Sequence, residues 1–144
     1  WQRDDATAEA MTSDGFLRTG DVAYMDDSGW VYLVDRTKDM ILCSGYNVYP
    51  RVIEEAIYEH PAVEEVSVIG IDDPYRGQAP KAFIKLKSGT KAFDFAELQS
   101  FLESRLGKHE RLAAMEIRAE LPKTPVGKLS KKELVDAERQ RAAG

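Results

Sequence analysis

The chain has 144 residues, the size of one domain or of one domain with an extension. Apolar residues make up 43% and charged residues 31%, a composition that favours a globular protein and excludes a disordered one. The single cysteine, Cys43, excludes a disulfide framework and a multi-cysteine zinc site, and it favours a reducing compartment, the cytoplasm. No apolar run reaches the roughly 18 residues of a transmembrane segment, and the first residues do not have the pattern of a signal peptide.

Negative charge is concentrated near the N-terminus. The formal net charge is −5, and residues 1–35 alone carry two arginines against eight carboxylates. The remaining residues are nearly balanced, which indicates two segments with different surroundings. A general nucleic-acid binder would show a basic face, so no nucleic-acid partner is expected. The basic residues clustered near the C-terminus are interpreted as a solvated helix face.

The N-terminal part predicts a β-hairpin after a polar stretch. Apolar strands at 22–25 and 30–34 flank residues 26–29, which are rich in turn formers. The charged run 35–39 then predicts a short exposed connector.

A short strand and a helix are predicted next. Residues 40–43 indicate a buried strand and 44–47 a loop. Pro50 is suited to the first turn of a helix, because the N–H that it lacks would be unpaired there. The buried stripe of this helix is predicted at apolar residues with helical spacing, namely Val52, Ile53, Ala56 and Ile57. His60-Pro61 ends the helix.

The second half of the chain predicts three strands and two helices. The strands are expected at 63–71, 80–86 and 115–117, with a loop at 72–78 between the first two. Asp94 and Glu97 indicate a capping box at the start of a helix, with Gly107 as its C-cap. A loop at 121–128 leads to a last helix after Ser130. This order predicts an α+β fold, a small mixed sheet with helices packed on one face, preceded by the hairpin.

Three polar groups could bind a ligand. In Thr19-Gly20-Asp21 the carboxylate could accept hydrogen bonds from vicinal hydroxyls, and a plain turn is the alternative. Arg36, with Lys38 two residues on, presents a planar fork of donors suited to hydroxyls or phosphate, and a surface salt bridge is the alternative. Lys128, after Gly127, could bring a positive charge to a phosphate or carboxylate oxygen, and an ordinary exposed lysine is the alternative.

Other common signatures of a catalytic site are absent from the sequence. His60 and His109 have no partners at the spacing of metal ligands, so no metal site is predicted. No Ser–His–Asp or Cys–His set at a recognisable spacing is present, and neither is a phosphate loop of the Walker or Rossmann kind.

Four segments, taken in chain order, are similar to sequence motifs of a known family. They are Thr19-Gly20-Asp21, Asp35-Arg36-Thr37-Lys38-Asp39-Met40-Ile41, Ser44-Gly45-Tyr46-Asn47-Val48-Tyr49-Pro50 with Ile53-Glu54-Glu55, and Pro122-Lys123-Thr124-Pro125-Val126-Gly127-Lys128-Leu129. In this order they resemble the C-terminal motifs of the adenylate-forming enzymes, which include acyl-CoA synthetases, nonribosomal peptide synthetase adenylation domains and firefly luciferase. The second and third segments are most similar to long-chain fatty-acid–CoA ligases. The resemblance covers essentially the whole chain.

The resemblance implies a two-step reaction. A carboxylate, here expected to be a fatty acid, attacks the α-phosphate of ATP to give an acyl-adenylate and pyrophosphate, and the thiol of coenzyme A then displaces AMP. In the family, the residues that match Asp21 and Arg36 hold the ribose hydroxyls of ATP. The lysine that matches Lys128 reaches the α-phosphate and the substrate carboxylate in the first step. Mg²⁺ is expected with ATP, with no ligands in this chain.

The resemblance also implies a rotating domain. The residue that matches Lys38 is the family's hinge, and the glycine that matches Gly45 lines the channel for the pantetheine arm of coenzyme A, with Ser44 and Tyr46 beside it. A glycine fits this task, because a side chain would block close passage of the ligand. One rotation would therefore bring in Lys128 for the first step and Gly45 for the second.

The resemblance divides the chain into three parts. Residues 1–35 look like the end of a larger N-terminal domain, 36–39 like the hinge and 40–144 like the mobile C-terminal domain. The family's phosphate loop, adenine site and acyl pocket belong to the larger domain and have no counterpart here. The chain is therefore expected to be a fragment, inactive alone, whose acyl-chain length and oligomeric state the sequence does not reveal. The family usually has a proline within the segment that matches 107–111, which leaves the approach to the last strand open.

Alternatives and further partners remain open at this point. An adenylation domain that serves a carrier-protein phosphopantetheine shares the same motifs. A non-catalytic module could instead bind an acidic partner through the basic C-terminal segment. The spacing from Pro122 to Gly127-Lys128 resembles the site that protein acetyltransferases modify in some acyl-CoA synthetases, which makes such an enzyme a candidate partner at Lys128. The larger domain could associate peripherally with a membrane.

Overall fold

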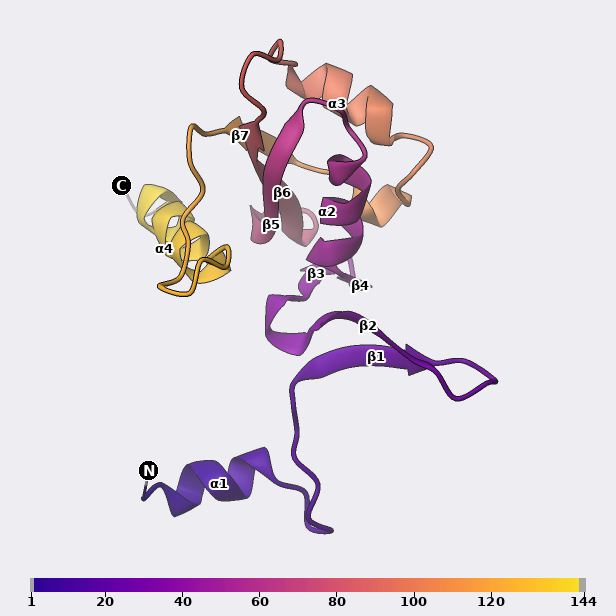
Figure 1. The fold of residues 1–144 in the computed structure, drawn as a ribbon, viewed down its shortest axis with the longest axis vertical. Helices are drawn as coiled ribbons and strands as arrows, with labels where there is room; N and C mark the ends of the chain where they lie inside the picture. The colour runs from indigo at the N-terminus through magenta and orange to yellow at the C-terminus, as the bar shows by residue number, and fades with distance from the viewer. Residues whose placement is uncertain (1, 143–144) are drawn as a thin grey trace. The chain divides into compact units, whose positions relative to one another are not determined.

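The chain divides into two compact units after Lys38. The computed structural model describes residues 2–142, and the two units comprise residues 1–38 and 39–144 (Figure 1). The three-part division at 35 and 39, with a hinge between the parts, stays a prediction.

The first unit contains a helix and a β-hairpin. The helix α1 spans Asp4–Ala10, and the strands β1 and β2 span Asp21–Met25 and Val31–Arg36. The strands pair antiparallel, which confirms the predicted hairpin. The α1 helix is an addition to the predicted elements; its two aspartates in the first turn complement the helix dipole.

The first unit has no buried core of its own. None of residues 2–38 is buried. Large apolar side chains on and near the hairpin are exposed, including Phe16 (69%), Tyr24 (60%) and Trp30 (71%). Large exposed apolar side chains clustered in one segment are typical of a segment that packs against another part of a protein.

The second unit is built on a five-stranded mixed sheet. Its strands are β3 Ile41–Cys43, β4 Tyr46–Val48, β5 Val63–Asp73, β6 Gly77–Leu86 and β7 Ala114–Ile117. They lie in the order β4-β3-β6-β5, with β7 also on β6. Only β6 and β7 run parallel; the other pairs are antiparallel. The predicted α+β fold with a small mixed sheet is therefore confirmed.

Two predicted loops are shorter than expected. The segment predicted as a loop at 44–47 contributes strand β4, because Ser44 and Gly45 alone make the turn from β3. Both turn residues have positive φ, 52° and 82°, which gives the twist that a two-residue hairpin needs. The strands β5 and β6 likewise continue toward each other and leave only residues 74–76 between them.

The helices begin where the sequence predicts. They are α2 Pro50–Tyr58, α3 Phe95–Leu102 and α4 Lys131–Ala142, and short 3₁₀ turns lie at η1 Thr37–Asp39 and η2 Lys108–Glu110. The capping box of α3 is confirmed: Asp94 Oδ1 accepts the N–H of Glu97 at 2.8 Å, and Glu97 Oε2 accepts the N–H of Asp94 at 2.9 Å.

Two details of the helix predictions are wrong. Val52 is 37% exposed whereas its neighbour Ile53 is fully buried, so the buried stripe of α2 is narrower than predicted. Gly107 is not the C-cap of α3, which ends at Leu102 with Glu103 as its cap. Gly107 instead precedes η2 with an ordinary φ of −68°, and its N–H donates to Glu110 Oε2.

Helices cover both faces of the sheet rather than one. The helices α2 and α3 pack on the face that includes Val66, Val68 and Ile84, whereas Leu134 of α4 packs with Ile69 and Phe83 on the other face. Figure 1 shows α4 across the sheet from α2. The central parts of β5 and β6 are buried on both faces, so the prediction of helices on one face is wrong.

Candidate functional site

The candidate site lies on the loop that carries Lys128. Residues 122–130, here called the lysine loop, fold back on themselves between β7 and α4. At the base Lys123 pairs with Leu129 in an antiparallel bridge, and the N–H of Ser130 donates to the carbonyl of Pro122 at 2.8 Å. Gly127 turns the chain with a φ of +80°, a conformation that glycine adopts without strain.

Lys128 presents an uncompensated positive charge. Its side chain is exposed, and no carboxylate of residues 2–142 forms an ion pair with its ammonium group. Lys123, the other lysine of the loop, pairs with Glu65 at 2.6 Å, and Lys131, the first residue of α4, pairs with Glu54 at 2.9 Å. Lys128 is therefore the lysine of this loop whose charge is open to an incoming anion.

Glu54 and Glu65 hold the base of the lysine loop against the sheet. Glu65 lies on β5, and its side chain is 21% exposed. Glu54 lies on α2 at 15% exposure, and its Oε1 also accepts the N–H of Val68 at 2.8 Å. Ion pairs shielded in this way hold their geometry better than fully exposed ones. The sequence analysis names Glu54 only as part of a family segment and gives neither glutamate a role, because the sequence does not show that each pairs with a lysine far along the chain.

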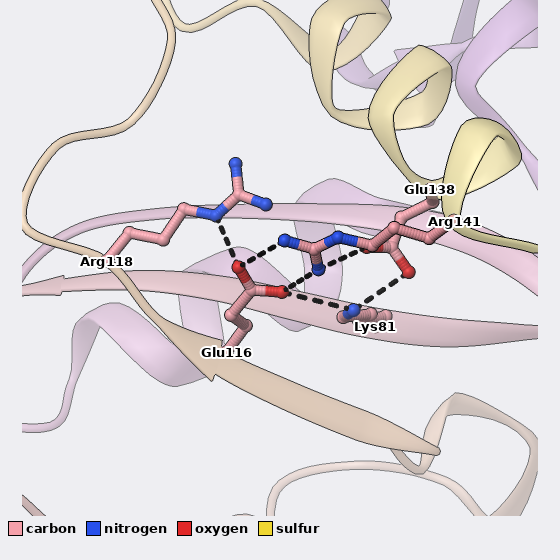
Figure 2. A network of polar contacts seen from close by, with 5 residues as sticks. All are labelled: Lys81, Glu116, Arg118, Glu138 and Arg141. Atoms are coloured by element: carbon pink, nitrogen blue, oxygen red, sulfur yellow. Dashed lines mark hydrogen bonds and ion pairs between the residues drawn. The ribbon is translucent and has the colours of Figure 1, made fainter. Parts of the chain in front are cut away.

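A charge network fastens α4, the helix that follows the lysine loop (Figure 2). Glu116 of β7 accepts hydrogen bonds from Arg118 and Arg141, both at 2.7 Å, and lies 3.3 Å from the ammonium of Lys81. Lys81 of β6 also pairs with Glu138 of α4 at 2.8 Å. Two residues of α4, Glu138 and Arg141, are thereby tied to β6 and β7.

The same network lowers the pKa of Glu116 to about 2. The hydrogen bond from Arg141 is the main cause, and Arg118 and Lys81 add to it, against the partial burial of the carboxyl group, which favours its neutral form. The carboxylate is therefore ionised at neutral pH and holds three cations together.

The turn Ser44-Gly45 forms a second candidate site on the same unit. A Cβ added to Gly45 would meet no atom within 4 Å, so the backbone there is open to a ligand. The N–H of Ser44 donates to the carbonyl of Arg76 at 2.8 Å, which ties this turn to the turn between β5 and β6. Tyr46 is 59% exposed, and its ring stacks on His109 at 4.7 Å between centroids.

Ser44, Gly45 and Tyr46 are consecutive and form one candidate site, and this site is separate from the lysine loop. No hydrogen bond or ion pair links these two parts within residues 2–142. His109 was interpreted as a residue without a site partner, and its stacking on Tyr46 had no signal in the sequence, because η2 and β4 meet only in the folded unit.

The first unit pairs the remaining two predicted ligand residues. Asp21 and Arg36 lie opposite each other at the open end of the hairpin, with Arg36 Nε 3.3 Å from Asp21 Oδ1. Thr19 Oγ1 accepts the N–H of Asp21 at 3.2 Å. Lys38 is the last residue of this unit and lies within η1.

Comparison with known protein families shows which family this chain belongs to. The model of the AMP-binding enzyme C-terminal domain matches residues 52–128, more than half of the chain. The chain belongs to this family. The matched region begins within α2 and ends at Lys128, so it includes the lysine loop up to that residue, whereas Asp21, Arg36 and the turn Ser44-Gly45 precede it.

Relatives of known activity agree with this assignment. The chain is 49% identical over 138 residues to the long-chain-fatty-acid–CoA ligase of Bacillus subtilis, covering 96% of this chain and 24% of that protein. It is 41% identical over 134 residues to the 2-succinylbenzoate–CoA ligase of Geobacillus kaustophilus, covering 93% of this chain and 27% of that protein. The chain thus spans about a quarter of the length of the curated relatives that it matches.

Solved structures of adenylate-forming enzymes share the fold. ATP-bound MatB from Rhodopseudomonas palustris superposes with a TM-score of 0.90 at 29% identity, covering 98% of this chain and 28% of that one. The amide bond synthetase McbA from Marinactinospora thermotolerans superposes with a TM-score of 0.85 at 34% identity, covering 95% and 28%. These chains show the same C-terminal domain within longer proteins.

Two observations bear on other kinds of site. The described residues contain no group of three or more His, Cys, Asp or Glu side chains that could hold a metal ion. Among the helices of residues 2–142, none has the length and apolar character to cross a membrane.

The Glu116 network predicts an acid-sensitive attachment of α4. Because the pKa of Glu116 is about 2 in the folded state and about 4.5 ordinarily, its stabilisation is present above pH 4.5 and is lost as the pH falls toward 2. When the pH is lowered from about 6 to about 2.5, the free energy of unfolding should therefore fall in the unmodified chain and in Glu116→Gln. The fall should be about 2–3 kcal/mol larger in the unmodified chain, because only that chain loses the ionised Glu116. Urea unfolding followed by circular dichroism measures this difference.

The control for this prediction is Glu120→Gln. Glu120 pairs with Lys85 at 3.2 Å but is 72% exposed, so its removal should leave the pH dependence almost unchanged. Parallel stability curves for the unmodified chain and Glu116→Gln would contradict the role of the network.

Proposed function

We propose that this chain is the C-terminal domain of an ATP-dependent carboxylic acid–CoA ligase that acts on fatty acids. Its membership in the AMP-binding enzyme C-terminal family and its similarity to long-chain-fatty-acid–CoA ligases support this proposal. Because the chain spans about a quarter of these relatives, the complete reaction is assigned to a longer protein that contains it.

The observation that carries the proposal is the uncompensated charge of Lys128. In the first step two anions, a carboxylate and the α-phosphate of ATP, have to approach each other, and negative charge increases at the phosphate. An ammonium group delivered by a preformed loop offsets this repulsion without reorganising during the reaction. The neutralised neighbours Lys123 and Lys131 leave Lys128 as the residue of the loop suited to this role.

Asp21 and Arg36 are proposed to bind the ribose of ATP. Their opposed positions at the end of the hairpin place a carboxylate acceptor beside a guanidinium donor, an arrangement that fits two vicinal hydroxyl groups. Mg²⁺ would enter with ATP as part of the nucleotide substrate, so no ligand for it is assigned to this chain.

The turn Ser44-Gly45, with Tyr46, is proposed to line the path of the coenzyme A arm in the second step. The absence of any atom near the Cβ position of Gly45 supports passage of a ligand along the backbone. Lys38 is proposed as the hinge on which residues 40–144 rotate between the steps, with 36–39 as the hinge segment. The exposed hairpin side chains support the proposal that residues 1–35 complete a larger preceding domain.

The acceptor of the acyl group is assigned to free coenzyme A. The most similar curated relatives are named as CoA ligases, which favours coenzyme A over a carrier-protein phosphopantetheine. The name of McbA, an amide bond synthetase, indicates that this domain also occurs with other acceptors. The cytoplasmic location stays a prediction from the sequence.

The 144-residue chain alone is expected to be inactive. Lys128 stabilises charge only when the nucleotide and the acid are held opposite it, and the proposed larger domain would hold them. Incubation with Mg-ATP, coenzyme A and a fatty acid, analysed by mass spectrometry, should give no acyl-CoA above the blank. Thioester formation by the isolated chain would contradict the need for the larger domain.

Substitution of Lys128 should separate the two half-reactions. In the intact ligase, Lys128→Ala is expected to slow adenylation about 100- to 1,000-fold, the effect of removing one group that stabilises transition-state charge. Thioester formation from preformed acyl-adenylate should change less than about threefold, because Lys128 does not act in that step. Pyrophosphate exchange and acyl-CoA release measure the two steps.

Lys132→Ala is the matched control for this experiment. Lys132 is an exposed lysine of α4 close to the lysine loop, and its loss should affect neither step. Equal losses of both half-reactions in Lys128→Ala would remove the proposed role of this residue.

Acetylation of Lys128 is proposed as a means of control. The side chain is exposed, and an acetyl group would remove the charge that adenylation needs. Incubation with a protein acetyltransferase and acetyl-CoA, followed by peptide mass spectrometry, should place the modification on Lys128. An unmodified Lys128 in a protein acetylated elsewhere would exclude this form of control.

A further inference from the structure

Thr124 contacts both backbone polar groups of Lys128. The N–H of Thr124 donates to the carbonyl of Lys128 at 2.7 Å, and the N–H of Lys128 donates to Thr124 Oγ1 at 3.2 Å. The carbonyl of Thr124 also accepts the N–H of Gly127 at 2.8 Å. We propose that Thr124 is a positioning residue, whose hydroxyl group sets the backbone of Lys128 for adenylation.

The base of the lysine loop does not depend on Thr124. The bridge between Lys123 and Leu129 and the ion pair from Lys123 to Glu65 hold it on one side, and Lys131 holds it on the other through Glu54. Leu121, just before the loop, is buried at 4% exposure. Loss of one hydroxyl group at residue 124 should therefore leave the loop folded and attached.

The conformation of the loop tip depends on Thr124 more strongly than the base of the loop does. Pro125 has no N–H to donate, and the apolar side chain of Val126 is 79% exposed, so neither side chain orders the tip. Gly127 at positive φ is the most permissive residue of the loop. The bond from the N–H of Lys128 to Thr124 Oγ1 is the side-chain contact that restricts the backbone at Lys128.

Restriction of this backbone matters because lysine has a long, flexible side chain. A shift at its Cα moves the ammonium group away from the oxygens that it has to reach, and small misplacements of a catalytic group are costly. Thr124 itself touches no substrate in this proposal, so its loss should lower kcat of adenylation and leave the KM for ATP nearly unchanged. The effect should be confined to the step that uses Lys128.

The proposal rests on the proposed adenylation role of Lys128, and the experiment separates the two. In the intact ligase, Thr124→Val keeps the shape and the backbone bond but removes the hydroxyl group, whereas Thr124→Ser keeps the hydroxyl group. We expect Thr124→Val to lower kcat of adenylation about tenfold, with the KM for ATP within about twofold, and Thr124→Ser to stay within about threefold of the unmodified enzyme. Thioester formation from preformed acyl-adenylate should be unchanged in both. Thr124→Ala serves as a second variant without the hydroxyl group and should behave as Thr124→Val.

A double variant tests whether Thr124 acts through Lys128. In a Lys128→Ala background, Thr124→Val should cause no further loss of adenylation, because a positioning residue has nothing left to position. A further tenfold loss in that background would overturn the proposal, and so would equal rates for Thr124→Ser and Thr124→Val. If Lys128→Ala slows both half-reactions equally, the proposed function fails, while the double variant still decides whether the two residues act as one unit.

Discussion

Burial of β5 and β6 on both faces is the constraint on which the rest of the second unit depends. The side chains of Val68 and Ile69, adjacent on one strand, enter two different hydrophobic clusters. One cluster requires α2 and α3, and the other requires α4. Because both ends of the lysine loop are attached to this packed layer, through Leu121 before it and α4 after it, the core determines where Lys128 emerges.

Charge pairing then distinguishes Lys128 from Lys123, the other lysine of the loop. Lys81, Lys123 and Lys131 each lie beside a carboxylate from another element, whereas Lys128 extends from a loop tip with no such partner among the described residues. The proposed delivery of a cation to two anionic substrates requires a lysine that is not already paired with a carboxylate. Ion-paired Lys123 and Lys131 hold the base of the loop in place, and Lys128 is the lysine proposed to act on the ligand. Lysine therefore contributes to stability where it is paired with a carboxylate, and it is proposed to contribute to function where it is unpaired.

Much of the fold followed from local patterns in the sequence. Pro50, the capping box of Asp94 and Glu97, and the glycine-containing hairpin loop marked element ends, because their effects act within a few residues. The errors arose where packing or pairing decides. Val52 fits the helical stripe but lies at its exposed edge, and the expectation of a loop at Tyr46 overlooked that Ser44 and Gly45 make a complete turn.

The sequence by itself determined the family motifs and hence the candidate residues Asp21, Arg36, Gly45 and Lys128, since each motif is a short continuous segment. Tertiary structure alone decided which groups surround them: Glu65 beside Lys123, His109 on Tyr46, and the network that ties α4 to β7. The physical reason is distance along the chain. A local pattern reports on neighbours within a turn or a strand, whereas ion pairs and ring stacking between distant segments exist only after the core has packed those segments side by side.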